Sequence, residues 1–497
     1  MTVMRFIGRQ REMQMLDRFY KGRKATLLIL YGRRRVGKTA LLTTWLDRQR
    51  IRAGLFWTAP AQLPAVQLRD FTHALLNIRG DQPPSDDYSF RNWDVAFEEL
   101  ARLAEKSSRP FVCVFDEFTH LVDADPSLAS ILQRVWDHRL SGVTNLRLVL
   151  TGSLIRVMEN EVLSARAPLF GRATMQYRLR PLPFGHLIEW FPKWTPAERV
   201  AAYAVAGGIP AYLDLFAEAG SLDDGLRTCI APGSLTTTDA ALVLSERVRV
   251  PLKYSTILAT LAAGFHAWGD ISLMSSVPET GLNSYLEQLE ALDLIERRAP
   301  VLASRSARRS RYHVKDPFLR FYFRFVVPHR TLIEQGRLDE AAAKISPELR
   351  SFIGLYTFEE LAREWVWAEG AASDLGFMPD EVGSYWTRVR GKPVQLDVVG
   401  VDKRARRLFI GETKWETGHQ ARGLLRDLVE RSQRWTQVKA EGWTAQYALF
   451  AREGFTPAAI AEAESMNARL VSLPQLEQRL VSDARRAQAL PTAQIEY

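Results

Sequence analysis

The segment Gly32-Arg-Arg-Arg-Val-Gly37-Lys38-Thr39 constrains the fold of this chain more than any other. It follows a short apolar run at residues 26–31 and leads directly into the helical pattern Thr39-Ala-Leu-Leu. A strand that ends in a glycine loop and continues as a helix is the first half of a strand–helix–strand unit, whose second strand lies parallel to the first. The motif therefore predicts an α/β domain with a parallel sheet.

The loop also predicts a ligand, because each of its residue types has a distinct role toward phosphate. Glycines let consecutive backbone N–H groups turn inward, a lysine reaches the β- and γ-phosphates, and a hydroxyl holds Mg²⁺. We expect ATP with Mg²⁺ to bind at Gly32, Arg35, Val36, Gly37, Lys38, Thr39 and Ala40.

The rest of the first domain continues the alternation of strands and helices. Further strands are expected at residues 53–58, 111–115 and 146–151, with helices after Lys38 and around Asp70, Phe97 and Leu132. The third strand runs into Asp116-Glu117, which predicts that Asp116 holds Mg²⁺ and that Glu117 polarises the attacking water. Thr151 and Ser153 end the next strand, where they either sense the γ-phosphate or form a simple turn.

Composition limits the class of protein. A chain of 497 residues exceeds one compact core, so roughly two to four domains are expected. Two cysteines exclude a disulfide framework, and Cys113 lies in an apolar run where a small core residue is expected. We find neither an apolar export signal nor the roughly 18 apolar residues of a membrane helix, so a cytoplasmic protein is expected. The net charge of +9 favours a polyanionic partner.

The motifs of the first 240 residues, taken together, resemble the archaeal-type ATPase family, a branch of the AAA+/STAND-like P-loop ATPases. Besides the loop and the acidic pair, the resemblance rests on Phe6-Ile-Gly8-Arg9, Thr151-Gly152-Ser153, Pro168-Leu-Phe-Gly171-Arg172 and Gly207-Gly208-Ile-Pro210. It implies a helical lid and a homo-oligomer, with a ring as one form.

The resemblance also implies roles for three residues. Arg172 is a candidate arginine finger that reaches a neighbouring subunit's ATP; the alternative is an arginine that caps a loop. Pro210 lies in a lid motif over the nucleotide base, or has a purely architectural role. Arg9 belongs to a segment that closes over adenine, or is a surface charge.

Residues 251–328 resemble a winged helix-turn-helix, with three short helical patterns followed by a basic wing. The wing carries Arg297, Arg298, Arg305, Arg308, Arg309 and Arg311. Such a run predicts contact with DNA phosphates, or else a solvated hairpin tip. Glu279, Glu287 and Glu290 on the third helix would repel phosphates, which favours the alternative of a structural coupler between domains.

The last third contains two strand patterns with a carboxylate on the first and Glu412-Thr-Lys414 on the second. Glu412 and Lys414 are two residues apart and point to one face, and a hairpin would bring Asp397 beside them. Two carboxylates and a lysine are the groups that metal-dependent hydrolysis of DNA needs. The alternative is a solvated edge hairpin with a salt bridge.

This pattern resembles the PD-(D/E)xK restriction-endonuclease-like superfamily, although Pro393 stands four residues before Asp397 instead of next to it. The resemblance implies Mg²⁺ or Mn²⁺ at Asp397 and Glu412, with Glu359 of an upstream helix as a further ligand or, alternatively, as part of an exposed helix face. It leaves open a domain that keeps the fold without catalysis.

The sequence therefore predicts a P-loop ATPase domain with a helical lid at 1–245, a winged helix at 246–330 and a nuclease-like α/β domain at 331–497. We expect an ATP-dependent DNA-processing enzyme that cleaves phosphodiesters. The alternatives are an ATP-dependent signalling or transcriptional switch that binds DNA or a partner without cutting, and a remodeller of proteins.

Overall fold

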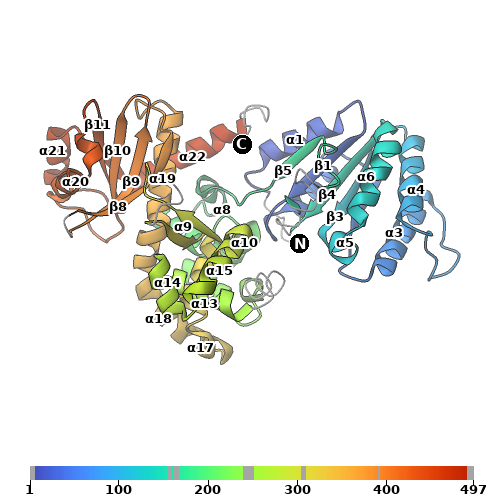
Figure 1. Ribbon diagram of the computed structural model, residues 1–497, viewed down its shortest axis with the longest axis horizontal. Coiled ribbons are helices and arrows are strands. Elements are labelled where there is room, and N and C mark those ends of the chain that lie inside the picture. Colours follow the sequence, from blue (N-terminus) through green and yellow to red (C-terminus); the bar gives the residue numbers. More distant parts are fainter. Residues whose placement is uncertain are drawn as a thin grey trace. The chain divides into compact units, whose positions relative to one another are not determined.

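The computed structural model describes residues 6–153, 158–159, 167–238, 251–303, 309–389 and 392–489 (Figure 1). Their contacts divide the chain into two compact units. The first unit consists mainly of residues 8–181 with 209–211, and the second mainly of residues 182–208 and 212–487. Among the helices of the described residues, none is long and apolar enough to span a bilayer.

The first unit contains a parallel five-stranded sheet with the strand order β2-β3-β4-β1-β5. Its strands are β1 (Thr26–Tyr31), β2 (Gly54–Thr58), β3 (Phe111–Asp116), β4 (Leu146–Gly152) and β5 (Met175–Arg178). The four predicted strands and the parallel sheet are confirmed. Strand β5 was not predicted, because a four-residue edge strand without a buried side chain carries no apolar run.

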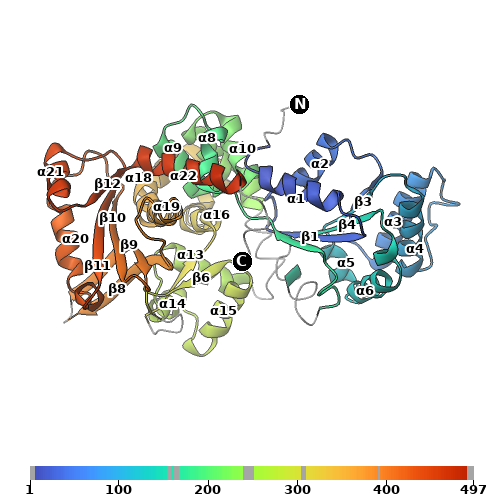
Figure 2. The same ribbon diagram turned by 90° about the horizontal axis from the view of Figure 1, so that it is seen from above.

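Helices cover both faces of this sheet (Figures 1 and 2). They are α1 (Gln10–Tyr20), α2 (Lys38–Arg48), α3 (Pro64–Arg79), α4 (Trp93–Lys106), α5 (Thr119–Ala124) and α6 (Leu128–His138), with a short η1 (Leu140–Gly142). One face of the sheet forms a core with α3, α4 and α6, in which Cys113 is fully buried as predicted. This packing fixes the carboxyl ends of β1, β3 and β4, where the site residues lie.

The second unit begins with a group of short helices and continues into the predicted winged helix. The first group comprises η3 (Phe184–His186), α8 (Leu187–Trp190), α9 (Pro196–Ala206), α10 (Pro210–Ala219) and α11 (Leu222–Ile230). Three helices follow, α13 (Pro251–Ala262), α14 (Trp268–Ser275) and α15 (Glu279–Ala291), and then an antiparallel pair, β6 (Ile295–Arg298) and β7 (Arg311–Val314). Three helices and a two-stranded hairpin are the elements that the sequence predicts here.

A helical segment with an aromatic core leads from the winged helix to the C-terminal sheet. Its elements are α16 (Pro317–Phe321), η4 (Tyr322–Val326), α17 (Arg330–Glu334), α18 (Leu338–Phe352), η5 (Ile353–Phe358) and α19 (Glu359–Ala371). Phe321, Phe325 and Phe352 form a continuous series of ring contacts in this segment.

The C-terminal domain contains a mixed five-stranded sheet with the order β12-β11-β10-β9-β8. Its elements are β8 (Glu381–Val389), β9 (Lys392–Asp402), β10 (Arg407–Lys414), α20 (Leu424–Ser432), η6 (Thr436–Lys439), β11 (Thr444–Ala451), α21 (Pro457–Ser465), β12 (Arg469–Ser472) and α22 (Leu473–Ala489). Strands β8, β9 and β10 are antiparallel, whereas β10, β11 and β12 are parallel. The predicted hairpin of residues 395–415 is confirmed.

A buried ion pair joins the helices after residue 182 to the last helix of the chain. Arg199 on α9 binds the Glu477 carboxylate on α22 with two bonds of 2.6 Å each, and both side chains are more than nine-tenths buried. Arg199 also donates to the Phe191 carbonyl at 3.0 Å. Nearby, a β-carbon on Gly185 would lie 2.3 Å from the Leu480 carbonyl oxygen, so the two segments are in direct backbone contact.

Because truncating one partner leaves a buried charge without compensation, Glu477→Ala should lower the free energy of unfolding of the second unit by about 3–5 kcal/mol. Gln478→Ala removes an exposed side chain from the same helix and should change it by less than about 0.5 kcal/mol. Urea unfolding followed by tryptophan fluorescence measures both. Equal midpoints for the two variants would contradict a stabilising role of this pair.

Candidate functional site

The glycine loop after β1 curves around the Lys38 ammonium. Lys38 is 5% exposed, and its Nζ donates to the carbonyl oxygens of Gly32 at 3.0 Å and Arg33 at 3.4 Å. A β-carbon on Gly32 would lie 2.3 Å from the Leu179 carbonyl oxygen, and Gly37 has a φ of 98° at the N-terminus of α2. Both positions therefore require glycine. Between them, Arg35 takes a positive φ of 64° and Val36 is buried.

Five residues, from the ends of β3 and β4 and the start of α2, form a continuous hydrogen-bond network beside this loop. Thr39 and Thr151 donate to the two oxygens of the buried Asp116 carboxylate at 2.9 and 2.6 Å. Thr151 also accepts from the Glu117 N–H at 3.0 Å. The Glu117 Oε2 accepts from Ser153, from its N–H at 3.2 Å and its hydroxyl at 2.8 Å. Thr151 and Ser153 are thus bonded to the acidic pair, whereas a simple turn would leave them apart.

This arrangement fits Mg²⁺-bound nucleotide by the chemistry of its donors. Lys38 supplies an ammonium for phosphate, while the Thr39 hydroxyl and the Asp116 carboxylate are hard oxygen ligands of the kind that Mg²⁺ prefers. Ala40 follows in the first turn of α2, within the helix N-terminus whose N–H groups favour anions.

Arg9 is buried, so the interpretation of this residue as a surface charge is wrong. Its guanidinium donates to Glu12 at 3.1 Å and to the carbonyls of Val36 at 3.1 Å and Arg180 at 2.8 Å. Burial lowers the pKa of Arg9, and Glu12 opposes that shift. Arg9 therefore joins the start of α1 to the backbone of the phosphate-binding loop.

Pro210 lies next to the loop as well. A β-carbon on Gly37 would be 4.0 Å from its Cγ. The preceding Gly208 permits a close backbone approach, since a β-carbon there would lie 1.8 Å from the Leu182 carbonyl oxygen.

Arg172 forms a surface ion pair within the first unit. Its Nε and Nη2 bind the two carboxylate oxygens of Asp137 on α6 at 3.2 and 3.0 Å. Its Nη1 donates to the Phe170 carbonyl at 3.0 Å. The bonds to Asp137 raise the pKa of Arg172. In this arrangement the guanidinium stabilises its own loop.

The C-terminal sheet brings Asp397, Glu412 and Lys414 together. Asp397 on β9 accepts from the Thr413 N–H at 3.2 Å, and Lys414 Nζ lies 3.1 Å from Glu412 Oε1 on β10. Burial and the Glu412 charge raise the pKa of Asp397. Glu412 is buried, and β10 lies between β9 and β11. The alternative of a solvated edge hairpin is therefore wrong.

Glu359 at the start of α19 lies close to the same group. Arg363, one turn later, binds Glu359 Oε2 at 3.2 Å and the Asp397 carbonyl at 2.9 Å. Burial, together with the Asp397 charge, raises the pKa of Glu359 to about 8. The alternative of an exposed helix face is wrong for this residue, because its side chain is only 15% exposed.

Two arginines of this cluster were missed by sequence reasoning. Arg363 follows Glu359 by four residues, and this spacing is a signal that the sequence contains. Arg431 on α20 binds Glu412 Oε2 at 2.7 Å across nineteen residues of sequence, and only the tertiary structure reveals this contact.

The three carboxylates do not form an open metal site in this arrangement. Among the described residues, no three His, Cys, Asp or Glu side chains converge in a way that could hold a metal ion. Oxygen ligands of the right kind are present, but Arg363, Lys414 and Arg431 bind two of the three carboxylates.

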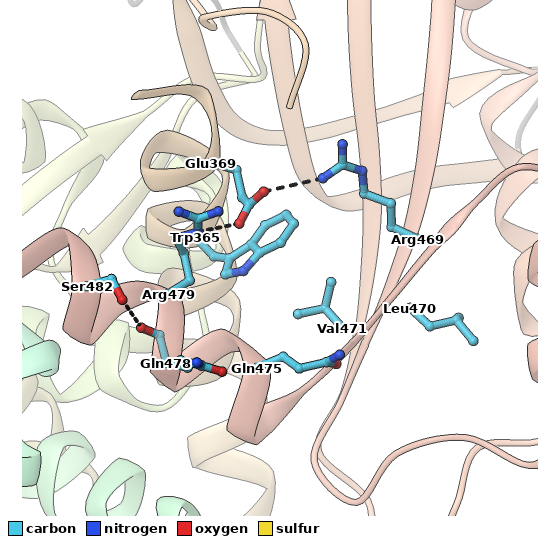
Figure 3. A pocket seen from close by; sticks show the side chains of 9 residues that line it. All are labelled: Trp365, Glu369, Arg469, Leu470, Val471, Gln475, Gln478, Arg479 and Ser482. Carbon is cyan, nitrogen blue, oxygen red and sulfur yellow. Dashed lines mark hydrogen bonds and ion pairs between the residues drawn. The ribbon is translucent and has the colours of Figure 1, made fainter. Parts of the chain in front are cut away.

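A separate cavity of about 640 Å³ lies between α19, β12 and α22 of the C-terminal domain (Figure 3). Glu369 in its wall binds Arg469 at 3.3 Å and also Arg479. Trp365 faces the same space (Figure 3). None of the predicted site residues lines this cavity, whose arginines are engaged in ion pairs.

Two family models match parts of this chain. Residues 6–216 match a family described as an ATPase domain predominantly from Archaea. This chain carries an archaeal-type P-loop ATPase domain. Residues 322–424 match a second family, described as "Archaea bacterial proteins of unknown function", which spans Glu359, Asp397, Glu412 and Lys414.

Two relatives of this chain occur in Methanocaldococcus jannaschii. An uncharacterized protein of this organism is 27% identical over 438 residues, 86% of this chain and 92% of the relative. An uncharacterized ATP-binding protein is 46% identical over 55 residues, 11% of this chain and 93% of the relative.

Two solved structures are similar at lower identity. A Walker-type ATPase of Pyrococcus abyssi is 20% identical with a TM-score of 0.48, covering 63% of this chain and 95% of that one. The Orc1 protein of Aeropyrum pernix, solved in complex with DNA, is 15% identical with a TM-score of 0.35, covering 69% and 93%.

The wing that follows the ATPase domain contacts the protein itself. Arg298 binds Glu360 at 2.7 Å, Arg309 donates to the Thr387 hydroxyl at 2.7 Å, and Arg311 lies over the Trp386 ring at 4.7 Å. These contacts hold the wing against α19 and β8, as the alternative of a structural coupler predicts, while contact of the wing with DNA phosphates stays a prediction. Arg305 and Arg308 lie outside the described residues.

A stacked pair of histidines lies at the base of this wing. The rings of His266 and His313 are 4.0 Å apart, and His266 also bonds to the Tyr312 carbonyl at 2.9 Å and to the Tyr356 hydroxyl at 3.3 Å. Burial lowers the pKa of His266 to about 4, and the charged groups that contribute are Arg311, Arg298 and Arg320. Burial likewise lowers the pKa of His313.

The His266 imidazole has a pKa near 6.5 in the unfolded chain and about 4 in the folded one. Because the unfolded state therefore binds the proton first, the free energy of unfolding of the second unit should fall as the pH is lowered from 6.5 to 4. The loss should approach about 3 kcal/mol at pH 4. In His266→Gln the pH dependence of urea unfolding should decrease, whereas His329→Gln, a histidine elsewhere in the same unit, should keep it. A wild-type slope in His266→Gln would contradict this assignment.

Proposed function

We propose that this protein is an ATP-dependent DNA-processing enzyme, whose ATPase domain hydrolyses ATP and whose C-terminal domain cleaves phosphodiesters with Mg²⁺ or Mn²⁺. The observation that carries the proposal is the meeting of Asp397, Glu412 and Lys414 on two central strands in a chain that also carries an ATPase domain. Such a set combines oxygen ligands with a cation for developing charge. The proposed division is an ATPase domain with lid at 1–245, a winged helix at 246–330 and a nuclease-like domain at 331–497.

In the ATP step, Lys38 binds the β- and γ-phosphates, while Thr39 and Asp116 hold Mg²⁺. Glu117 orients the attacking water. Ser153 holds the Glu117 carboxylate through its N–H and its hydroxyl, so a γ-phosphate that binds Ser153 would release Glu117 toward the water. Pro210, beside Gly37, contributes the lid edge of the nucleotide pocket.

Arg172 acts in this proposal as an arginine finger between subunits of a homo-oligomer, for which a ring is the natural form. The Asp137 carboxylate, bound by two guanidinium nitrogens, has the paired-oxygen geometry of a phosphate. Asp137 would be the partner that Arg172 leaves when it reaches a neighbouring ATP.

In the DNA step, Asp397 and Glu412 would hold the metal ion, with Glu359 as a further ligand. The bound ion would lower the pKa of an attacking water and neutralise charge at the phosphate. Lys414 lies at 3.1 Å from Glu412, where its ammonium positions that water and offsets developing negative charge.

A second candidate is an ATP-dependent signalling or transcriptional switch that binds DNA or a partner without cutting. Both oxygens of Glu412 are held by cations, and three wing arginines are engaged within the protein. These contacts favour a closed binding domain over an open catalytic site. Cleavage assays distinguish the two candidates.

Glu117→Gln should keep nucleotide affinity and lower the rate of ATP hydrolysis by about 10²- to 10⁴-fold, because the water loses its orienting carboxylate. Lys38→Ala should weaken nucleotide binding about 10- to 100-fold, since a charge-assisted contact to phosphate is lost. A fluorescent ATP analogue measures binding, and phosphate release measures turnover. Full turnover in Glu117→Gln would exclude the proposed role.

Asp397→Asn should abolish cleavage of labelled duplex, single-stranded or branched DNA in Mg²⁺ or Mn²⁺. Asp402→Asn, on the same strand but paired with Arg407 at the far end of the hairpin, should cut like the wild type. Repeating the assay with Lys38→Ala, with and without ATP, shows whether nucleotide drives cleavage. If no DNA is cut while ATP is hydrolysed, the non-cutting switch is the function.

A further inference from the structure

Arg431, on α20, makes the shortest ion pair with Glu412, which lies on β10. Its Nη2 lies 2.7 Å from Glu412 Oε2, while the Lys414 ammonium holds Oε1 at 3.1 Å. Both carboxylate oxygens are therefore engaged, and Glu412 is 7% exposed. A metal ion that binds this carboxylate would therefore share its oxygens with two cations.

The cluster already contains one cation for each of its carboxyl groups. The three carboxylates of Glu359, Asp397 and Glu412 face the three cations Arg363, Lys414 and Arg431. Adding a divalent cation at Glu412 would place it within hydrogen-bonding range of a guanidinium in a buried site, where like charges repel strongly. At least one cation must therefore move when the metal enters.

Arg431 is better able to move than Lys414. Lys414 follows Glu412 by two residues on the same strand, so the pleat keeps both side chains on one face. Arg431 reaches Glu412 from α20, on a long side chain that is about one-third exposed. Its Nε is buried and has no hydrogen-bond partner among the residues that the structure describes, so the present contact satisfies the guanidinium only in part.

We propose that Arg431 holds Glu412 closed in the absence of substrate, and that it moves to a phosphate of the DNA backbone when a divalent cation binds. This inference rests on the proposed nuclease function and adds a gating residue to it. A guanidinium suits both positions, because its planar fork binds a carboxylate or a phosphate with two N–H groups. Arg431 thus couples metal entry to the arrival of a phosphodiester.

The test compares full-length Arg431→Gln with the wild type in two binding measurements that need no cleavage. Titration calorimetry with Mn²⁺ alone should show binding at least about tenfold tighter in Arg431→Gln, since Glu412 has lost its competing cation. Fluorescence anisotropy with a labelled duplex in Ca²⁺ should show DNA binding about tenfold weaker, since the phosphate has lost its partner. The control is Arg434→Gln, which should change neither affinity. Arg434 lies just after the same helix, is partly exposed and pairs with Glu430.

Arg431→Lys keeps the charge without the fork, so it should bind Mn²⁺ like the wild type and DNA less tightly. This split separates gating from a merely structural contact, which would move both affinities together. Thermal melts establish that the variants fold, and Arg431→Met replaces the glutamine variant if that one does not.

The outcomes separate this inference from the nuclease proposal. Unchanged Mn²⁺ affinity in Arg431→Gln overturns the gating role, even if the wild type cuts DNA. The double variant Asp397→Asn, Arg431→Gln tests where the metal binds. If its Mn²⁺ binding is still tighter than that of the wild type, the gating role is also overturned, because the metal then binds at a site without Asp397. Absence of Mn²⁺ binding in every variant overturns both the gating role and the metal-dependent nuclease.

Discussion

The buried Asp116 carboxylate is the point on which the ATPase site depends. It accepts hydrogen bonds from Thr39 at the start of α2 and from Thr151 at the end of β4, so it aligns the phosphate-binding loop with the ends of two strands. A carboxylate at 3% exposure is stable only because both oxygens are satisfied. The parallel sheet makes this possible, since its carboxyl ends meet at one edge.

In the second unit the equivalent role belongs to helix α19, because two adjacent glutamates on it bind different groups. Glu360 forms ion pairs with Arg320 at 3.0 Å and with Arg298 at 2.7 Å. Burial alone would raise the pKa of Glu360, but the two arginines outweigh this effect and hold the pKa at about 2. Glu359 faces Arg363 and Asp397. One turn of α19 therefore binds the winged helix through Glu360 and contributes Glu359 to the carboxylate cluster. The position of the wing is thereby linked to the geometry of the cluster.

Local sequence was sufficient where chemistry follows directly from neighbouring residues. The loop of residues 32–39, the acidic pair after β3 and the 395–415 hairpin were all predicted, because glycine conformations, buried apolar runs and side-chain alternation are properties of short segments. Arg9 was interpreted less well. From sequence alone, a basic residue is usually interpreted as a surface charge. Only long-range contacts, such as the hydrogen bond from Arg9 to the Arg180 carbonyl, show that it is buried.

The sequence by itself determined the α/β class of the first domain, its phosphate-binding chemistry and the presence of two carboxylates and a lysine on one hairpin. The tertiary structure decided which charges meet. Arg431 reaches Glu412 across nineteen residues, and Arg199 reaches Glu477 across 278. The physical reason is that an ion pair depends on distance and burial, which local propensities do not encode, so a site can be predicted as open while the fold closes it.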